Sequence, residues 1–137
     1  MLSILLKIPI LKRLIPSLTI RILKLFKKNR GYFKIKNSKM FLDFLDPIDR
    51  GIILFQEYDK SEFDYLTKQI NSFKPNHFLD GGANCGYYSI KIANEYPDIK
   101  IFAFEPNQEA YFKFSNTLKI DHQLANKITL YNFGLSN

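Results

Sequence analysis

The sequence has little cysteine and histidine, and these shortages exclude two kinds of site. Cys85 is the one cysteine, so no disulfide can form within the chain, as is typical of proteins from a reducing cytoplasm. The two histidines, His77 and His122, lack the spacing of metal ligands, both with each other and with that cysteine. We therefore expect a cytoplasmic protein with neither a disulfide scaffold nor a metal site.

Long hydrophobic runs are also missing. A membrane-spanning helix needs about 20 consecutive apolar residues, whereas Lys7, Lys12, Arg13 and Arg21 interrupt the N-terminal part. A secretory signal carries its positive charges before its apolar run, and here they lie within and after it. The N-terminal part therefore predicts neither a membrane span nor a cleaved signal.

Acidic residues are absent from the first 42 positions, which carry 11 of the 20 lysines and arginines. All 13 acidic residues come from Asp43 onward, so the formal net charge of +7 arises in the N-terminal part. A charge asymmetry of this kind indicates an anionic partner. Nucleic acid is not the expected partner, because no helix-turn-helix, aromatic RNA-binding motif or zinc spacing accompanies the charge.

The same basic part has an apolar stripe that is typical of amphipathic helices. Its members recur at steps of four and three residues: Ile4, Ile8, Leu11, Ile15, Leu18, Ile22 and Leu25. Because Pro9 and Pro16 interrupt it, we expect residues 1–31 to form a basic leader of short helices, the longest over 16–28. Two interpretations stay open. Residues 1–30 lie on the inner face of an anionic membrane, or the stripe packs on the domain or on another chain.

Residues 32–74 predict a small mixed segment before the main domain. A hairpin is expected around Asn37 and Ser38, because apolar and polar residues alternate on both sides of this pair. Three further elements are predicted: a turn at 46–49, a strand at 52–55, and a helix from 61 to about 71, which opens with a capping box. Three carboxylates are expected to be solvated or capping groups: Asp43, Asp49 and Glu57.

The third part, residues 75–137, predicts an α/β fold. Its expected elements are a strand at 77–80, a helix at 87–95, a strand at 100–105, a helix at 107–120 and a strand at 128–133. Strand, glycine turn, helix and strand make one βαβ unit. Phe78 and Leu79 should be buried in the sheet, with Asp80 at its carboxyl edge, where open α/β sheets bind ligands. The expected apolar positions of the second helix are Ala110, Phe112, Phe114 and Leu118.

The turn after the first strand says most about function. Its glycines allow positive φ and a close approach of a ligand to the backbone. The turn lacks the G-x-G-x-x-G pattern of dinucleotide sites and a Walker lysine, so phosphate is not the expected guest. Carboxylates flank it instead, Asp80 before the turn and Glu105 at the end of the next strand. This arrangement suits S-adenosylmethionine, with its amine, its positive sulfonium and two ribose hydroxyls that would donate to Glu105.

The segments D-G-G-A-N-C-G-Y-Y-S (80–89) and E-P-N (105–107) resemble two motifs of the FkbM-type S-adenosylmethionine-dependent methyltransferases. In that family the first loop reads D-x-G-A-N-x-G-x-x-[ST] and the second E-P-[NS]. The resemblance runs from about Met40 to Asn137 and is strongest from Phe78. It implies a class I methyltransferase (Rossmann-like) fold, with methyl transfer to oxygen, often to a sugar hydroxyl. The residues that it assigns to the cofactor are Asp80, Gly81, Gly82, Ala83, Asn84, Gly86, Tyr87, Glu105, Pro106 and Asn107.

A class I methyltransferase sheet has more strands than the three expected here. Their expected order is 3-2-1, which leaves strand one, normally central, at an unpaired edge. We therefore expect the N-terminal part of a methyltransferase, with the missing C-terminal half or another chain covering that edge. The base and the acceptor pocket should lie in that half, so no catalytic residue is named here. The isolated chain should bind cofactor weakly at most and show no turnover. Ser136 and Asn137 are further candidates, for contact with adenine.

Two other function classes fit part of the sequence. An NAD-dependent oxidoreductase would use the same βαβ unit with Glu105 on the ribose, but it requires the missing G-x-G-x-x-G. Competition between NAD and S-adenosylhomocysteine separates this class from a methyltransferase. A non-catalytic adaptor would use the basic leader to bind a membrane or a partner, and it would bind liposomes without binding cofactor.

Overall fold

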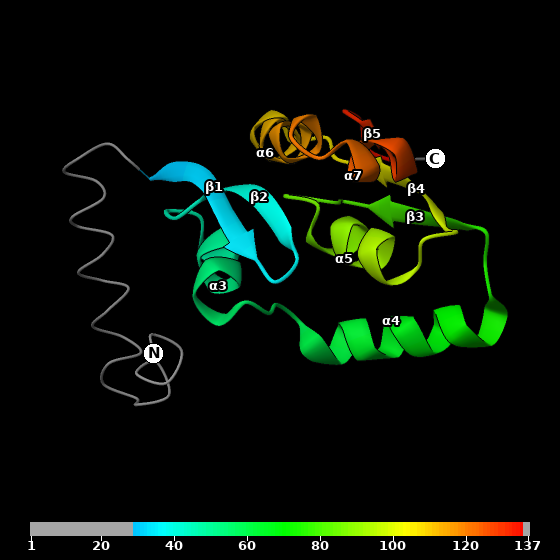
Figure 1. Ribbon diagram of the computed structural model, residues 1–137. Coiled ribbons are helices and arrows are strands. Elements are labelled where there is room, and N and C mark those ends of the chain that lie inside the picture. Colours follow the sequence, from blue (N-terminus) through cyan, green and yellow to red (C-terminus); the bar gives the residue numbers. More distant parts are fainter. Residues whose placement is uncertain (1–28, 136–137) are drawn as a thin grey trace.

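The computed structural model describes residues 29–135 of the chain. Its elements in chain order are β1 (Arg30–Ile35), β2 (Ser38–Asp43), α3 (Pro47–Phe55), α4 (Lys60–Phe73), β3 (His77–Gly81), α5 (Tyr87–Glu95), β4 (Lys100–Phe104), α6 (Gln108–Lys119), α7 (His122–Lys127) and β5 (Ile128–Tyr131) (Figure 1). The predicted leader helices within 1–28, and the adenine candidates Ser136 and Asn137, lie outside the described residues.

β1 and β2 form the predicted antiparallel hairpin, in which Ile35 lies opposite Ser38. The turn consists of Lys36 and Asn37, one residue earlier than expected, and Ser38 is a buried residue of β2. Lys36 takes a left-handed conformation (φ 50°), as tight two-residue hairpin turns require. The alternating burial along both strands sets one face of the hairpin against the core.

Helix α3 replaces the predicted turn at 46–49 and the predicted strand at 52–55, both of which are wrong. Asp46 is the N-cap, and its carboxylate accepts hydrogen bonds from the backbone N–H groups of Ile48 (2.8 Å) and Asp49 (3.2 Å). Proline is favourable at the first helical position, because that position has no intrahelical N–H bond to lose. The Asp-Pro pair therefore starts a helix in this chain.

Helix α4 confirms the helix predicted from residue 61 but not its capping box. The N-cap is Asp59, which is left-handed (φ 47°) and makes no side-chain cap bond. Ser61 lies within the helix, and its hydroxyl donates to the carboxylate of Glu62 (2.7 Å). Phe63 and Ile70 are the buried residues that attach α4 to the rest of the molecule.

The parallel sheet has the order β3-β4-β5, which is the predicted 3-2-1 order and leaves β3 at an edge. The strands and helices predicted within residues 75–137 are confirmed, with small shifts at their ends. Helix α7 was not predicted. It begins where the carboxylate of Asp121 accepts from the backbone N–H groups of Gln123 and Leu124 (both 3.1 Å).

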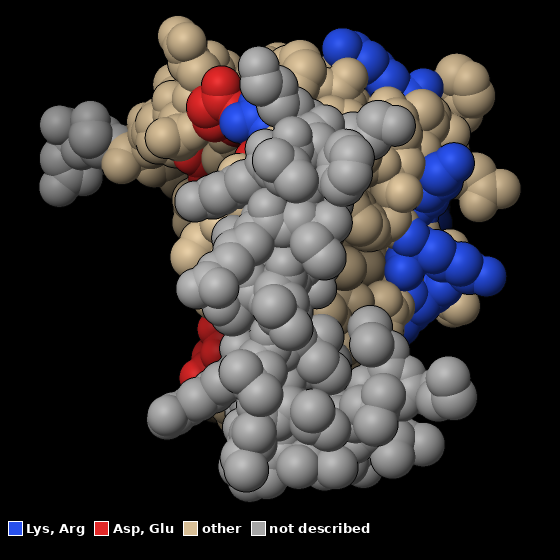
Figure 2. All heavy atoms as spheres, turned by 90° about the vertical axis from the view of Figure 1, so that its left-hand side faces the viewer, with Lys and Arg blue, Asp and Glu red and all other residues tan. Residues whose placement is uncertain are grey.

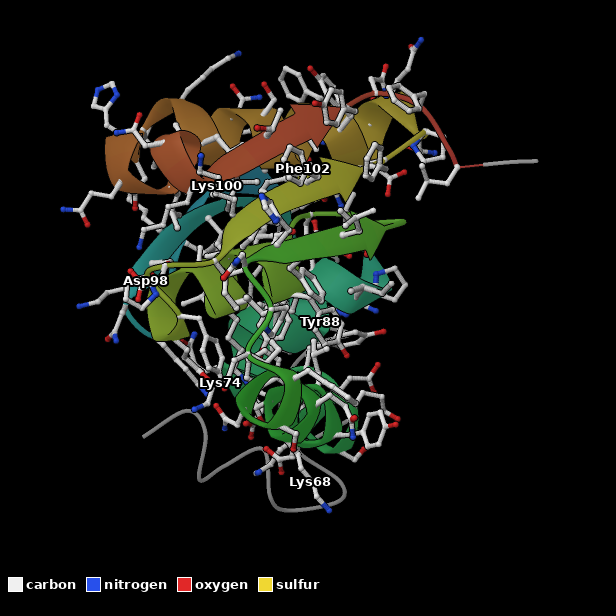
Figure 3. All side chains as sticks on the ribbon, turned by 90° about the vertical axis from the view of Figure 1, so that its right-hand side faces the viewer. Lys68, Lys74, Tyr88, Asp98, Lys100 and Phe102 are labelled. Atoms are coloured by element: carbon white, nitrogen blue, oxygen red, sulfur yellow. The ribbon has the colours of Figure 1, made fainter. Side chains whose placement is uncertain are left out.

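The two faces of this sheet have different surroundings. Helices α5, α6 and α7 pack on one face, which we call the covered face, and there Ile101 and Ala103 have no exposed surface. On the other face Leu79 is 62% exposed, so its expected burial is wrong. We call this the open face, and by strand alternation it carries His77, Leu79, Gly81, Lys100, Phe102, Phe104, Thr129 and Tyr131. Figure 3 labels two of its residues, Lys100 and Phe102.

Helix α6 turns a different set of residues inward than the sequence predicts. Its buried residues are Ala110, Lys113, Phe114 and Thr117. Phe112, expected to face the sheet, is 48% exposed and packs edge-on against Phe41 of the hairpin, with ring centroids 5.9 Å apart. The helical period places residue 113 beside 110, 114 and 117, so a lysine lies within the buried stripe.

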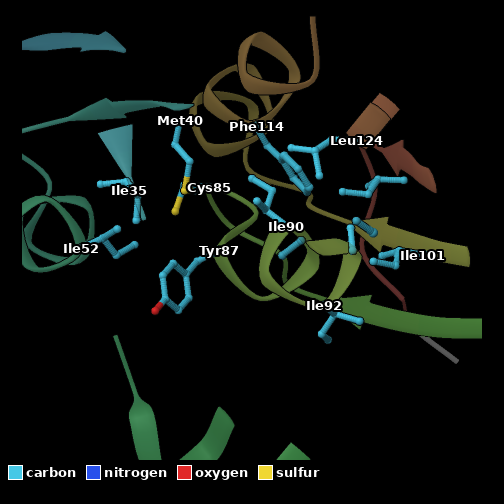
Figure 4. Close-up of a cluster of buried hydrophobic side chains, with 14 of the residues drawn as sticks. Ile35, Met40, Ile52, Cys85, Tyr87, Ile90, Ile92, Ile101, Phe114 and Leu124 are labelled. Carbon is cyan, nitrogen blue, oxygen red and sulfur yellow. The ribbon is translucent and has the colours of Figure 1, made fainter. Parts of the chain in front are cut away.

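The hairpin, helix α3 and the βαβ unit share one hydrophobic core (Figure 4). Met40 of β2, Ile52 of α3, Ile90 of α5 and Phe114 of α6 all belong to this cluster of buried residues. The segment at 32–74 therefore packs as part of the same body as the sheet. Within residues 29–135, no helix is long and apolar enough to cross a membrane.

Basic residues of the hairpin extend the charge pattern of the N-terminal part. Lys34 and Lys39 lie opposite each other in the two strands, and the Lys39 ammonium lies 5.5 Å from the centre of the Tyr32 ring. Like charges directly opposite each other in a sheet are unfavourable. Figure 2 shows lysine and arginine side chains gathered along one side of the face that it presents.

Candidate functional site

The turn between β3 and α5 depends on left-handed backbone. Gly82 (φ 79°), Asn84 (φ 50°) and Gly86 (φ 83°) all have positive φ, a conformation that asparagine tolerates better than most residues. The Gly82 N–H donates to the carbonyl of Phe104 (2.8 Å), which ties the turn to the end of β4. A Cβ at Gly86 would lie 2.3 Å from the ring of Phe114, so no side chain fits there.

Glu105 joins the two sequence motifs. One oxygen of its carboxylate accepts from the backbone N–H of Asn84 (2.7 Å), and the other accepts from the backbone N–H of Asn107 (2.8 Å). Glu105 is the residue directly after β4, and it is 6% exposed. Each carboxylate oxygen can accept a second hydrogen bond. Glu105 therefore shapes the turn and still has acceptor capacity beside it.

Asp80 faces α5 from the end of β3. Its carboxylate accepts a hydrogen bond from the hydroxyl of Ser89 (2.6 Å), the residue at the [ST] position of the first motif. Burial raises the pKa of Asp80 above its ordinary value, against the effect of the Ser89 bond, and the nearby Glu105 raises it further. The first and last residues of the motif are thus hydrogen-bonded to each other.

Asn107, the last residue of the second motif, starts helix α6. It is the N-cap, and its side-chain oxygen accepts from the backbone N–H groups of Glu109 (2.9 Å) and Ala110 (3.1 Å). Its backbone N–H is bound to Glu105. The side-chain oxygen and the backbone N–H of Asn107 therefore both stabilise local structure.

Two hollows meet at the glycine turn, because Gly82 and Asn84 line both. The first, of about 490 Å³, is called the acidic hollow and is lined by Asp46, Gly82, Asn84, Glu105, Asn107, Glu109, Ala110 and Lys113. The second, of about 240 Å³, is called the tyrosine hollow and is lined by Ile48, Tyr58, Asp59, Gly82, Ala83, Asn84, Cys85, Tyr87 and Tyr88. A ligand lying across the turn would reach both.

A buried cluster of charges, which the sequence did not predict, borders the acidic hollow. The Lys113 ammonium donates to the carboxylates of Asp49 (2.6 Å) and Asp46 (3.2 Å), and Asp49 also accepts from the backbone N–H of Asp43 (2.8 Å). Burial lowers the pKa of Lys113, but the two carboxylates outweigh it and the pKa is raised. Burial raises the pKa of Asp49. Asp49 has no exposed surface, so its expected solvation is wrong.

Tyr87 and Tyr88 have different surroundings. Tyr87 is 6% exposed, and its hydroxyl accepts from the backbone N–H of Tyr58 (3.1 Å). Tyr88 is less buried and stacks on Phe63 of α4, between α5 and α4 (Figure 3). Cys85 is buried, and burial followed by the charge of Asp49 raises the pKa of its thiol, so this thiol is unreactive at neutral pH.

The structure brings most of the predicted cofactor residues to the two hollows. Six line one or both: Gly82, Ala83, Asn84, Tyr87, Glu105 and Asn107. Four line neither: Asp80, Gly81, Gly86 and Pro106. Asp80 and Gly86 stabilise the turn instead: Asp80 accepts a hydrogen bond from Ser89, and Gly86 packs against the ring of Phe114. Between residues 29 and 135, no group of three or more His, Cys, Asp or Glu residues is placed to hold a metal ion.

Comparison with solved structures identifies the fold. The crystal structure of "a putative caffeoyl-CoA O-methyltransferase from Staphylococcus aureus" matches with a TM-score of 0.50 and 21% sequence identity. The match covers 55% of this chain and 35% of that chain, so it spans about a third of the solved protein. No family model matches the sequence, and no curated protein matches it. The three-stranded sheet and its helices are therefore part of a Rossmann-like methyltransferase fold.

Proposed function

We propose that this chain carries the cofactor-binding part of an S-adenosylmethionine-dependent methyltransferase of the FkbM type. The main support is Glu105, a carboxylate held by two backbone N–H groups beside a left-handed glycine turn. The turn has no phosphate-binding pattern. The fold agrees with this function, and the two motifs favour the FkbM type within it.

The residues at the turn fit the proposed cofactor better than a dinucleotide. Glu105 keeps acceptor capacity for ribose hydroxyls. Asp46 and Glu109 also line the acidic hollow, where Asp46 is paired with Lys113 (3.2 Å) and Glu109 with Arg30 (2.9 Å). Among residues 29–135, the one cation that lines this hollow is Lys113, which is already paired with two carboxylates. A pyrophosphate would meet acidic side chains there, whereas the amine and sulfonium of S-adenosylmethionine would be favoured.

Bound at this site, S-adenosylmethionine would supply an electrophilic methyl group to an acceptor hydroxyl oxygen; the C–S electron pair would stay on sulfur, and the hydroxyl proton would pass to a base or to water. The residues of this chain would contribute binding and alignment, since displacement requires the reacting atoms to be nearly collinear. A sugar or related hydroxyl is the proposed acceptor, because the FkbM resemblance implies it.

We further propose that a polypeptide segment beyond these 137 residues, in a longer form of the protein or on another chain, covers the edge of β3 and the open face. The support is the exposure of Leu79 at that edge and the larger size of the structural neighbour. An uncovered apolar edge strand is an aggregation hazard. Cofactor affinity of the 137-residue chain alone is therefore expected to be low, and turnover is expected only with that segment present.

The cofactor proposal is tested by titrating the ¹⁵N-labelled chain with S-adenosylhomocysteine and, separately, with NAD. We expect S-adenosylhomocysteine to shift the backbone amide signals of Gly82, Ala83 and Asn84, which line the hollows. The amides of Lys34 and Lys39 in the hairpin serve as internal references. A response to NAD with none to S-adenosylhomocysteine would show a dinucleotide site and refute the proposal.

Glu105→Gln is the matching variant, with Glu95→Gln at the exposed far end of α5 as its control. The amide nitrogen of glutamine cannot accept a hydrogen bond, so one backbone bond to the turn is lost. We expect Glu105→Gln to abolish the response to S-adenosylhomocysteine and Glu95→Gln to keep it. Equal responses from both variants would remove Glu105 from the site.

A further inference from the structure

On the basis of the function proposed above, we propose that the tyrosine hollow is the methyl-acceptor site, and that it takes a hydroxyl-bearing ring with an apolar face. This hollow shares Gly82 and Asn84 with the acidic hollow, where Glu105 lies. A cofactor whose ribose is held by Glu105 would direct its methyl end over the shared turn. The acceptor oxygen must approach from the far side of that turn, where the tyrosines are.

The walls of the tyrosine hollow suit a ring. The ring of Tyr87 lies edge-on to Tyr58, with centroids 6.1 Å apart, and edge-on to Tyr88, with centroids 5.9 Å apart. The ring of Tyr87 is thus nearly perpendicular to both of its neighbours (86° and 83°), so the hollow can present ring faces and ring edges to a guest. Aromatic faces bind other rings, and the apolar faces of saturated rings, by dispersion and burial of apolar area.

The loop that brings Tyr58 to the hollow has an uncommon backbone. Gln56 (φ 57°) and Asp59 (φ 47°) are both left-handed although neither is glycine. The bond from the Tyr58 N–H to the Tyr87 hydroxyl (3.1 Å) holds this loop against the start of α5. A left-handed residue at the end of a helix, such as Gln56, is common. A left-handed N-cap such as Asp59 is not, and residues in uncommon conformations concentrate at ligand sites.

Asp59 gives the hollow a hydrogen-bond acceptor. It occupies the N-cap position of α4 but makes no side-chain cap bond, although most N-cap carboxylates do. Asp59 is one of the residues that line the hollow, and a carboxylate can accept from the hydroxyl of a bound ring. Burial, with the charge of Asp59 second, raises the pKa of Tyr88 to about 12. The Tyr88 hydroxyl therefore stays a donor at neutral pH.

A phenol and a pyranose share the required chemistry, since both carry hydroxyls on a ring with an apolar face. The probes are catechol and methyl β-D-glucopyranoside, each titrated into the ¹⁵N-labelled full chain with and without saturating S-adenosylhomocysteine. We expect one of them to shift the amides of Asp59 and Tyr88, and equally so with S-adenosylhomocysteine present. A response to catechol alone identifies a phenolic acceptor, and a response to the glycoside alone identifies a sugar.

Two variants test the walls of the hollow. Tyr88→Leu removes the stacking ring and should weaken probe binding about fivefold. Tyr65→Leu, on the exposed side of α4, is its control and should leave binding unchanged. Asp59→Asn keeps the left-handed backbone, which asparagine tolerates, and should also weaken binding. Its control is Asp64→Asn, which removes a carboxylate paired with Lys60 on the surface of α4.

The outcomes separate this inference from the proposed function. If S-adenosylhomocysteine displaces the ring probe, the cofactor itself occupies the tyrosine hollow and the acceptor assignment is overturned. Binding of S-adenosylhomocysteine without any response to either ring probe overturns it as well. A ring response that Tyr88→Leu and Asp59→Asn both weaken supports the acceptor site. If S-adenosylhomocysteine then fails to bind, the cofactor proposal alone is refuted.

Discussion

The covered and the open face belong to the same three strands, yet they differ in almost every physical respect. On the covered face Ile101 and Ala103 have no exposed surface, and a lysine is buried nearby with two carboxylates as partners. On the open face Leu79 is 62% exposed, and its aromatic residues find partners mainly in one another. Stability thus comes from one side of the sheet, and the other side is left available for contact.

The glycine turn between β3 and α5 belongs to the covered side. Gly86 packs against Phe114 of α6, and Glu105 is bound to the backbone at the start of that same helix. The turn is therefore held by residues that are themselves buried. Substitutions of one residue type on the two faces should differ in their effect on stability, and the following three pairs measure that difference.

The largest effect is expected for a lysine pair. Lys113→Met leaves Asp49 buried without its cation, which should reduce the free energy of unfolding by about 4 kcal/mol. Lys100→Met on the open face removes an exposed charge and should change it by less than about 0.5 kcal/mol. Urea denaturation followed by circular dichroism measures both. A small loss for Lys113→Met would mean that water reaches Asp49 and that the cluster is not buried in solution.

A glycine pair should give the next largest difference. Gly86→Ala places a Cβ 2.3 Å from Phe114 at a position with φ 83°. Strain and overpacking together should reduce stability by about 3 kcal/mol. Among residues 29–135, Gly81→Ala on the open face meets only Leu135, at 3.7 Å, and should be close to neutral. The same denaturation curves serve here, and equal midpoints for the two variants would contradict the packing of Gly86 on Phe114.

The smallest difference is expected for two conservative aliphatic changes. Ile101→Val removes one methylene from a site with no exposed surface and should reduce stability by about 1 kcal/mol. Leu79→Val at an exposed site should change it by less than about 0.3 kcal/mol. Thermal unfolding by differential scanning calorimetry resolves the pair. A similar loss for Leu79→Val would show that something covers the open face in solution.

The elements that the sequence predicted well are those with local signals. The βαβ unit follows from apolar runs, a glycine turn and helical periodicity, all within 77–105. Helix α3 was missed because Asp46-Pro47 is favourable both in a turn and at a helix start. The packing of the following apolar residues on the core decides between them, and that packing is not a local property.

The charged cluster at Lys113 could be predicted only in part. The phase of α6 places residue 113 between Ala110 and Phe114, so its burial was open to prediction. Its partner Asp49 lies 64 positions away, and no local pattern links the two. The exposure of Leu79 was missed for a related reason, since an apolar strand in a parallel sheet usually has both faces covered.

The sequence separations of these contacts also order the folding of the chain. The bonds that shape the turn join residues close in sequence, with Asp80 and Ser89 nine positions apart and Asn84 and Glu105 twenty-one apart. The contacts between the hairpin and α6 join residues much farther apart in sequence, such as Phe41 and Thr117, which are 76 positions apart. Short loops close at a smaller entropic cost than long ones. We therefore expect the glycine turn to assemble before the hairpin docks onto it.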